Sequence, residues 1–341
     1  MSIVNIFRND AFSEVALTSS VERIPHLPQV LSNMDLFTPN PIRTTALAVE
    51  ERNGILSLVP MSERGAPTNS ERTTERRKMR YFDVPRIFKG DTIHSHELQN
   101  VREFGQETVL MQIQAEVARR LAGPTGILTH LDYTEEFQRL AAVQGYLLDA
   151  DGSIWYDWFD EFGFVKPDVI EFALAAKLPG TLRPIINELV RSMARSSQGA
   201  FTTSTSVTAL CGDHFYDLLI THPDVEKTYV NWSDAAELRR GGAFSHFVFA
   251  EVEWVNYRGS DDNSTIKIGS DEAKFFPKNA PGIFEKAMAP GESFEWMNTP
   301  GKERYVVPIF DRDRNSWWRM EAYEYPLFIC KRPETLRTGR A

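Results

Sequence analysis

The chain has 341 residues, of which 42% are hydrophobic and 25% are charged. This length is typical of about two domains, and this composition supports a packed core, which excludes a wholly disordered chain. The formal net charge of −9 argues against a sequence-specific DNA- or RNA-binding protein, because such proteins usually present a basic face to the phosphates.

No segment is predicted to direct the chain out of a cytoplasm. Residues 1–10 have neither a basic start nor a long apolar run, so they do not resemble a signal peptide. No stretch approaches the roughly 18 apolar residues that a membrane span requires. The two cysteines, Cys211 and Cys330, are too few for a disulfide framework, and we expect both to be buried, reduced thiols.

Residues 1–41 predict an extended arm rather than a domain. Four prolines between residues 25 and 41 interrupt regular structure, and the apolar residues among them follow no regular period. An arm with this much apolar surface needs another surface to lie against. The candidates for contact with a neighbouring subunit are Leu31, Met34 and Phe37.

Residues 43–88 predict a long, projecting β-loop. Ala46–Glu51 and Ile55–Val59 flank Asn53–Gly54, a pair that favours a two-residue hairpin turn. The charged segment that follows predicts a projecting tip, and Tyr81–Phe88 predicts a returning strand. We expect the tip to contact an acidic patch of a neighbouring subunit, with nucleic acid or solvent as the alternatives. Its basic residues are Arg72, Arg76, Arg77, Lys78 and Arg80.

Two helices are predicted next. Leu110–Leu121 places apolar residues three, four and four positions apart, which is the period of one helix face, and Gly123–Pro124 ends this helix. A second helix is predicted to begin at Thr134 as N-cap, with Glu135–Glu136 in its first turn, and to end at Gly145.

The remaining elements mix helices and strands without strict alternation, which predicts the α+β class. Tyr146–Leu148 and Ile154–Phe159 are predicted to form a hairpin. Further helices are predicted at Asp168–Lys177, Thr181–Ser197, Asp213–Ile220 and Ser233–Arg240. Further strands are predicted at Phe244–Tyr257, Thr265–Ile268, Tyr305–Ile309 and Tyr325–Cys330.

Catalytic and metal-binding patterns are weak in this sequence. His94 and His96 share the spacing of a strand face, but no third or fourth metal ligand accompanies them. Asp157 with Asp160 or Glu161, set among aromatic residues, is the pattern closest to the paired carboxylates of a glycosidase. A carbohydrate-active hydrolase using these residues is therefore the alternative function from the enzyme class.

Four segments, His26–Phe37, Glu63–Pro67, Trp155–Gly163 and Tyr325–Cys330, occur in this order along the chain. Together they resemble the major capsid proteins of the lambda protein E family of tailed bacteriophages, and the resemblance spans nearly the whole chain. That family is similar in fold to the Hong Kong 97 capsid protein. Another phage structural part, such as a tail-tube or decoration protein, is a third possibility, although such proteins are generally shorter.

The resemblance implies a structural protein without catalytic residues, metal or cofactor. It implies that copies of the chain self-assemble, as hexamers and pentamers, into an icosahedral head shell that encloses double-stranded DNA. The implied partners are a scaffolding protein, a portal and non-specifically packaged DNA, and a decoration protein is left open. The implied location is the virion, after assembly in the host cytoplasm. The implied parts are an N-terminal arm at 1–41, an extended β-loop at 42–92, a peripheral domain with a spine helix at 93–169, an axial domain at 170–304 and peripheral return strands at 305–341.

Overall fold

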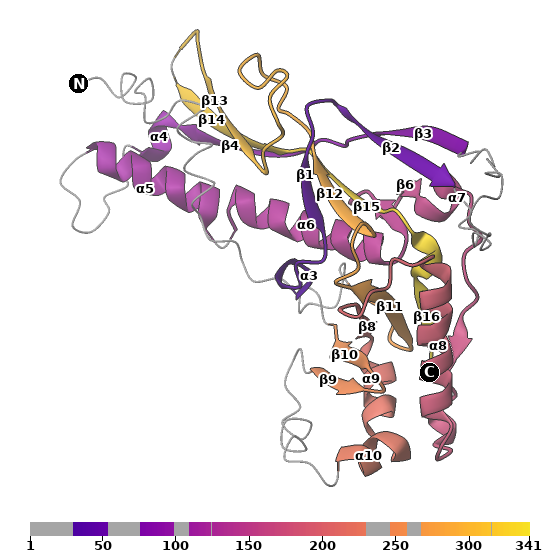
Figure 1. Cartoon of the computed structure of the whole chain (residues 1–341). Helices are drawn as coiled ribbons and strands as arrows, with labels where there is room; N and C mark the ends of the chain where they lie inside the picture. The colour runs from indigo at the N-terminus through magenta and orange to yellow at the C-terminus, as the bar shows by residue number, and fades with distance from the viewer. Residues whose placement is uncertain are drawn as a thin grey trace, which may run out of the picture.

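The computed structural model describes residues 30–53, 76–98, 109–123, 125–229, 246–257, 267–314 and 316–341. The predicted strand Ile55–Val59, the basic residue Arg72 and the predicted helix Ser233–Arg240 lie outside these ranges. The described residues form two bodies at an angle to each other (Figure 1). One contains two long helices and the other a six-stranded sheet, and this mixture confirms the predicted α+β class.

The long-helix body is built on α5 (Val109–Ala122) and α6 (Ile127–Val143). These two helices lie end to end along the length of this body (Figure 1). An antiparallel sheet, in the order β13–β14–β4, packs on them through apolar residues of both layers. Its strands are β4 (Ile87–His94), β13 (Tyr305–Phe310) and β14 (Trp317–Glu324). The short helix α4 (Ser95–Leu98) follows β4. The helix predicted at Leu110–Leu121 is thus confirmed, and so is the strand predicted at Tyr305–Ile309.

The predicted start of the second helix is wrong, because α6 begins at Ile127. Its N-cap is Gly126, and Thr134 lies inside the helix, where its hydroxyl donates to the His130 carbonyl at 2.9 Å. Burial of the first apolar turn of α6 against the sheet outweighs the intrinsic preference of Thr134 for a cap. As a consequence, Glu135–Glu136 lie within α6 and are buried.

The end of the predicted arm packs on its own subunit. Helix α3 (Val30–Asn33) contains Leu31, which is buried in the core, and β1 (Thr38–Pro41) pairs in parallel with β12 (Phe284–Met288). The Phe37 ring lies 5.3 Å from that of Phe284 and 5.1 Å from that of Phe328. Leu31 is thus held in the core of its own subunit, whereas Met34 and Phe37 pack against that core and stay partly exposed, and their contact with a neighbouring subunit stays a prediction. The third strand of this sheet is β15 (Pro326–Cys330).

The predicted β-loop is a two-stranded ribbon with a different pairing. β2 (Ala46–Asn53) pairs with β3 (Arg76–Asp83), and Asn53 lies opposite Arg76, so the predicted turn at Asn53–Gly54 is wrong. Arg76–Arg80 accordingly lie along a strand and not at a loop tip. The strand predicted at Tyr81–Phe88 is interrupted around Pro85, which separates β3 from β4.

The second body contains a six-stranded sheet in the order β7–β16–β11–β8–β10–β9. Its strands are β7 (Ile170–Glu171), β8 (Ser206–Cys211), β9 (His246–Phe249), β10 (Val252–Asn256), β11 (Glu272–Lys278) and β16 (Arg337–Arg340). Around it lie α8 (Leu182–Ser196), α9 (Asp213–Ile220) and α10 (Pro223–Tyr229) (Figure 1). The helices predicted at Thr181–Ser197 and Asp213–Ile220 are confirmed.

Several predictions for this body are corrected. The predicted helix Asp168–Lys177 contains β7 and the 3-10 turn η2 (Leu174–Ala176). The predicted long strand Phe244–Tyr257 contains the hairpin β9–β10, whose turn residues Ala250 and Glu251 both have positive φ. Lys267 and Ile268 are not in a strand. The final strand β16 pairs with β11 and β7, so the last residues of 305–341 join this sheet and do not return to the long-helix body.

Candidate functional site

The acidic residues of the hydrolase alternative form the start of a short helix. Strand β6 (Ile154–Asp157) pairs with β5 (Tyr146–Leu148), and α7 (Trp158–Phe162) follows it directly. The Asp157 carboxylate caps α7 by accepting the Phe159 N–H at 2.9 Å. Asp160 and Glu161 occupy the first turn, where negative charge complements the helix dipole. The hydrolase interpretation is not supported, because these carboxylates cap and stabilise the N-terminus of α7.

The two histidines of the weak metal-binding pattern lie beside each other. His94 ends β4 and His96 lies in α4, and their rings stack with centroids 5.5 Å apart. Within the described ranges, no three His, Cys, Asp or Glu side chains are grouped so that they could hold a metal ion. Within the same ranges, no helix combines the length and the apolar character needed to cross a membrane. Both cysteines are free and buried, as predicted, and burial raises the pKa of each thiol.

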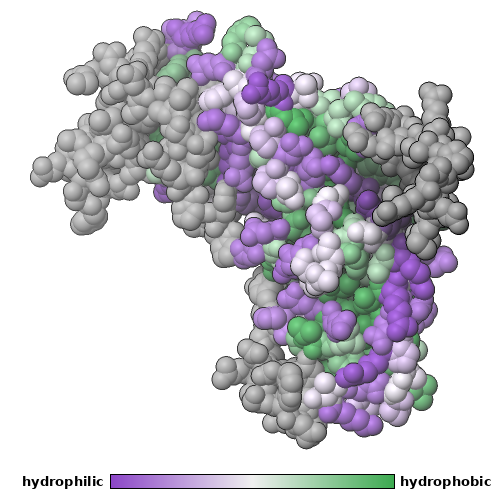
Figure 2. All heavy atoms as spheres, in the orientation of Figure 1, coloured by the Kyte–Doolittle hydropathy of each residue, from purple (hydrophilic) through white to green (hydrophobic). Residues whose placement is uncertain are grey.

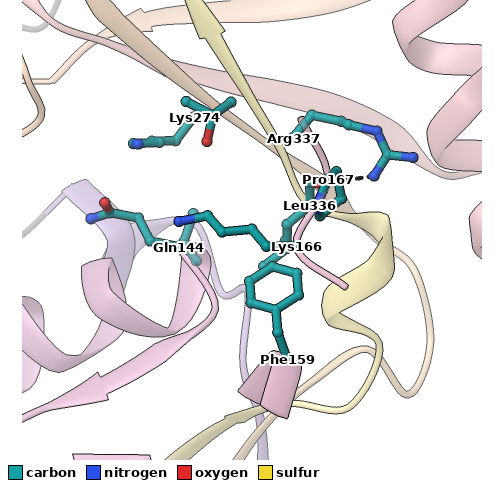
Figure 3. Close-up of a pocket in the computed structure, with 9 residues that line it drawn as sticks. Gln144, Phe159, Lys166, Pro167, Lys274, Leu336 and Arg337 are labelled. Carbon is teal, nitrogen blue, oxygen red and sulfur yellow. Dashed lines mark hydrogen bonds between the residues drawn. The ribbon is translucent and has the colours of Figure 1, made fainter. Parts of the chain in front are cut away.

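A small hollow lies at the seam between the two bodies (Figure 3). Gln144 and Phe159 line it from the end of α6 and from α7, and Lys274 and Arg337 from β11 and β16. Its free volume of about 10 Å³ is that of about one water-sized sphere. This hollow is therefore a packing feature of the seam and has no room for a substrate.

The base of the β2–β3 ribbon is clamped to its own subunit by aromatic residues. The Phe82 ring lies 5.6 Å from that of Tyr156 and 5.3 Å from that of Trp158. The Asp83 N–H donates to the Tyr156 hydroxyl at 3.0 Å, and the Arg80 guanidinium lies 5.5 Å from the centre of the Phe162 ring. Arg80 is thus directed at its own α7, and this clamp fixes the direction in which the ribbon leaves the body.

The opposite face of the ribbon is exposed and partly apolar. Alternate strand residues point to opposite faces, so Met79 and Tyr81 point away from the clamp. Their exposed fractions are 55% and 67%. Lys78 on the same strand is also exposed. Figure 2 shows hydrophobic residues at the surface of both bodies, interrupted by hydrophilic ones. The outward face of β3 thus presents two large apolar side chains to solvent.

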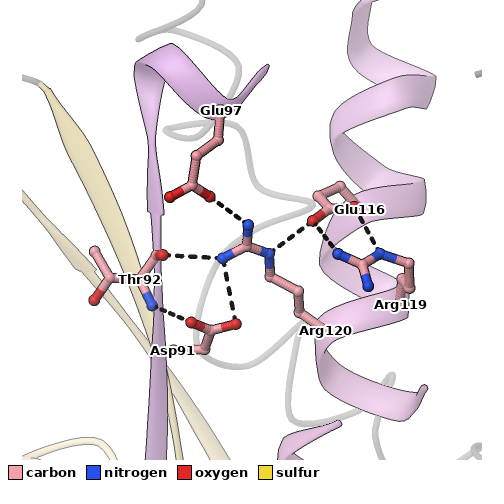
Figure 4. Close-up of polar contacts among 6 residues, drawn as sticks. All are labelled: Asp91, Thr92, Glu97, Glu116, Arg119 and Arg120. Carbon is pink, nitrogen blue, oxygen red and sulfur yellow. Dashed lines mark hydrogen bonds and ion pairs between the residues drawn. The ribbon is translucent and has the colours of Figure 1, made fainter. Parts of the chain in front are cut away.

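Arg120 ties the first long helix to the sheet (Figure 4). From α5 its guanidinium donates to the Thr92 carbonyl at 3.0 Å, and it forms ion pairs with Asp91 at 3.3 Å, with Glu116 at 2.7 Å and with Glu97. Hydrogen bonds from Arg119 and Arg120 hold the pKa of Glu116 at about 2, although its partial burial acts in the opposite direction. A planar guanidinium suits this task because its donors diverge in fixed directions.

A buried charged junction lies where α6 meets the two sheets of its body. Arg304, which precedes β13, forms an ion pair with Glu324 of β14 at 2.5 Å and another with Asp132 of α6. Lys286 of β12 lies 2.6 Å from Glu135, which also contacts Arg139 at 2.5 Å. These pairs join three elements that are distant in sequence.

Glu136 extends the junction to the arm and to the second body. One oxygen of its carboxyl group accepts the Leu31 N–H at 2.9 Å and the Tyr257 hydroxyl at 3.2 Å. Leu31 belongs to α3, and Tyr257 follows β10 in the six-stranded body. Burial raises the pKa of Glu136 above its usual value. A single side chain therefore connects the arm, the long helix and the second body.

Among the described residues, the junction contains more carboxyl groups than cationic side chains. Among the described residues it contains four carboxyl groups, from Asp132, Glu135, Glu136 and Glu324, and three cations, from Arg139, Lys286 and Arg304. Burial, followed by repulsion from Glu135, raises the pKa of Glu324 to about 8. Glu135 is also fully buried, but Lys286 and Arg139 lower its pKa. Glu324 therefore keeps its proton to a higher pH than an ordinary glutamate does.

Local sequence patterns did not predict this junction. Charged residues in a helix usually indicate a solvent-exposed face, and the acidic pair Glu135–Glu136 resembled a first turn. A usable signal was the spacing of Glu135 and Arg139, four residues apart, because such pairs face each other on a helix. Its partners Lys286 and Arg304 carry no local signal at all.

Residues 13–341 match the family model described as phage major capsid protein E. The chain belongs to this family. It is 27% identical over 357 residues to the major capsid protein of Salmonella phage Felix O1, a match that covers 95% of each chain. Family and relatives confirm the predicted resemblance and do not support the hydrolase alternative.

Solved structures show the fold of this phage capsid family member. A crystal structure assigned to a prophage capsid protein of Escherichia coli CFT073 aligns with a TM-score of 0.57 at 14% identity, over 96% of this chain and 98% of that one. The bacteriophage PhiM1 mature capsid aligns with a TM-score of 0.51 at 10% identity, over 93% and 88%. The fold is thus the Hong Kong 97-type capsid fold, as predicted.

Proposed function

We propose that this protein is the major capsid protein that builds the icosahedral head shell of a tailed bacteriophage around double-stranded DNA. The observation that carries the proposal is the match of residues 13–341 to a capsid family. The shape of the subunit supports it, since the ribbon stands out from the body and presents exposed apolar residues. Repeated weak contacts between such surfaces, each of roughly 4 kcal/mol, are enough for a closed shell and still allow misplaced subunits to leave.

Each part of the subunit is proposed to make a different contact in the assembled shell. The long-helix body is the peripheral domain, which holds most of 93–169 and 305–330 together with β4 and β12. Most of 170–304 is the axial domain that meets its copies around hexamer and pentamer axes. The ribbon within 42–92 reaches a neighbouring subunit, and the basic residues Arg72, Arg76, Arg77 and Lys78 contribute to that contact. Assembly takes place in the host cytoplasm with a scaffolding protein and a portal, and the net charge of −9 supports enclosing DNA without gripping it.

Assembly with and without an intact ribbon face tests the proposal. The full chain is expressed with its neighbouring phage genes, and the particles are counted by negative-stain electron microscopy. Tyr81→Asp should abolish shells without changing the melting temperature of the subunit, because Tyr81 is exposed in the single chain. Val165→Asp, at a residue 93% exposed elsewhere, is the matched control. A wild-type chain that stays monomeric beside its scaffold contradicts the proposal.

A further inference from the structure

An open hollow of about 260 Å³ lies where β4, the end of α5 and the start of α6 meet. We call it the β4 pocket. β4 is an edge strand of its sheet and Thr125 beside it is exposed, so the pocket opens to solvent. A cavity of this volume has room for several water molecules or one small ligand, unlike the hollow at the seam. The residues that line it are Lys89, Gly90, Asp91, Arg119, Arg120, Thr125 and Ile127.

The wall of the β4 pocket carries more positive than negative charge. Three of its lining residues are cationic and one is acidic. The acid, Asp91, already accepts the Thr92 N–H at 2.8 Å and pairs with Arg120 at 3.3 Å (Figure 4). Lys89 lies two positions before Asp91 on the same face of β4, and among the described residues it has no ion-pair partner. The Lys89 ammonium therefore leaves an uncompensated positive charge in the pocket.

A nearby histidine is sensitive to this charge. Burial lowers the pKa of His130 of α6 below its usual value, and repulsion from the Lys89 charge lowers it further. An anion bound beside Lys89 would act in the opposite direction and raise the pKa of His130. Because His130 is exposed, its ring can report on what occupies the pocket.

The arginines of the pocket are held in fixed positions by one carboxylate. Glu116 accepts hydrogen bonds from Arg119 Nε at 2.9 Å, from Arg119 Nη2 at 2.7 Å and from Arg120 Nε at 2.7 Å (Figure 4). Within the described ranges Arg119 Nη1 has no partner, so this nitrogen remains able to donate. Since Glu116 already orders the Arg119 side chain, a ligand that binds Nη1 costs little further conformational entropy.

The groups that the pocket offers define the class of its ligand. They are the Lys89 ammonium, Arg119 Nη1 and the Thr125 hydroxyl, all of which can donate hydrogen bonds. Donors of this kind match a tetrahedral oxyanion, which has more acceptor oxygens than the two of a carboxylate. The first turn of α6, which Ile127 begins, adds a partial positive charge. The net charge of −9 disfavours an extended polyanion such as DNA, so a small oxyanion suits the pocket better.

We propose that the β4 pocket binds a phosphate ion, with Lys89, Arg119 and Thr125 as its donors. The ion joins β4 to α5 and to the turn before α6, beside the contacts that Arg120 makes between β4 and α5. The site lies within one chain and needs no contact between subunits. It can therefore be tested on unassembled subunits, and its failure leaves the proposed function standing.

Histidine NMR of the unassembled full chain tests the site. The His130 ring signal, assigned by its loss in His130→Gln, is followed while sodium phosphate replaces sodium chloride at constant ionic strength. We expect a saturable shift, half-complete at about 1 mM phosphate, together with a rise in the pKa of His130. Lys89→Gln should weaken the binding about tenfold, because it removes a charged donor. Lys177→Gln, at an exposed lysine of the second body, is the matched control and should bind as the wild type does.

A second variant and two further anions separate the possible outcomes. Arg119→Gln should weaken phosphate binding to a similar degree, which keeps the test valid if Lys89→Gln alters the fold. A shift that grows linearly with phosphate, or that both variants retain, means an adventitious ion only and overturns the inference. Acetate that saturates the same signal as tightly contradicts a tetrahedral ligand. A short DNA duplex that saturates it at a lower phosphate concentration contradicts a small ion and assigns the pocket to nucleic acid instead.

Discussion

Replacing Glu324 with glutamine should remove a large part of the pH dependence of subunit stability. The pKa of Glu324 in the folded chain is about 8, against an ordinary value of 4.5. Between these two values the folded chain holds a proton that the unfolded chain has lost, so the unfolding free energy falls as the pH rises. The stabilising contribution is complete below the unfolded pKa and is lost as the pH passes the folded one. The loss is about 1.4 kcal/mol per pH unit, or about 3 kcal/mol from pH 5 to pH 7.

Glutamine reproduces the protonated form of this side chain. Its carbonyl oxygen can still accept the hydrogen bond that Arg304 Nε donates to Glu324 Oε1, and within the described part of the chain its amide replaces an oxygen, Oε2, that has no hydrogen-bond partner. Wild type and Glu324→Gln should therefore differ little at pH 5. From pH 5 to pH 7 the wild type should lose about 3 kcal/mol of unfolding free energy through Glu324, and the variant should not show this loss.

Urea unfolding of unassembled subunits, followed by tryptophan fluorescence at several pH values, measures this difference. Equal m-values in wild type and variant confirm that the same surface is exposed on unfolding. Glu188→Gln, on the exposed side of α8, is the matched control and should keep the wild-type pH dependence. Parallel pH curves for wild type and Glu324→Gln would refute the reasoning, because Glu324 would then carry no proton into the folded state at neutral pH.

Three further predictions concern folding. Arg304→Met leaves two buried carboxyl groups without their cation and should lower the unfolding free energy by roughly 3–5 kcal/mol; a loss below about 1 kcal/mol in urea unfolding would contradict the junction. Gly145→Ala should destabilise the subunit, since an added Cβ would lie 2.3 Å from the Phe159 ring at a backbone φ of 91°; an unchanged melting temperature would oppose this. The thiols of Cys211 and Cys330 should react with a thiol reagent only after unfolding, and rapid labelling of native subunits would disprove their burial.

The junction has a consequence for how the two bodies are held. Its ion pairs connect α6 to both sheets of the long-helix body, and Glu136 adds α3 and Tyr257 of the other body. Removing one partner from such a network leaves a buried group without compensation, which costs more than the pair contributes. The relative position of arm, helix and second body therefore depends on every member of the network being present.

Local pattern was sufficient where one period or one turn decides the structure. The apolar spacing of Leu110–Leu121 predicted α5, and Thr181–Ser197 predicted α8, because each apolar stripe needs only one neighbouring surface to become a helix. The capsid family followed from four short segments of the sequence. The hairpin was predicted at Tyr146–Leu148 and Ile154–Phe159 because its turn lies within the same short stretch, although its second strand ends at Asp157, where α7 follows.

Only the tertiary structure decided which distant segments meet. β2 pairs with Arg76–Asp83, and β16 joins the six-stranded sheet, since strand partners are chosen by packing and not by proximity in sequence. Glu135 contacts Arg139 on α6 itself and the distant Lys286, and Glu136 contacts Leu31 and Tyr257, which lie 105 and 121 residues away. No local spacing indicates the distant partners. The sequence by itself determined many of the elements and the family. A charged residue and its counter-charge can lie anywhere in the chain, so only the packed structure determined the junction.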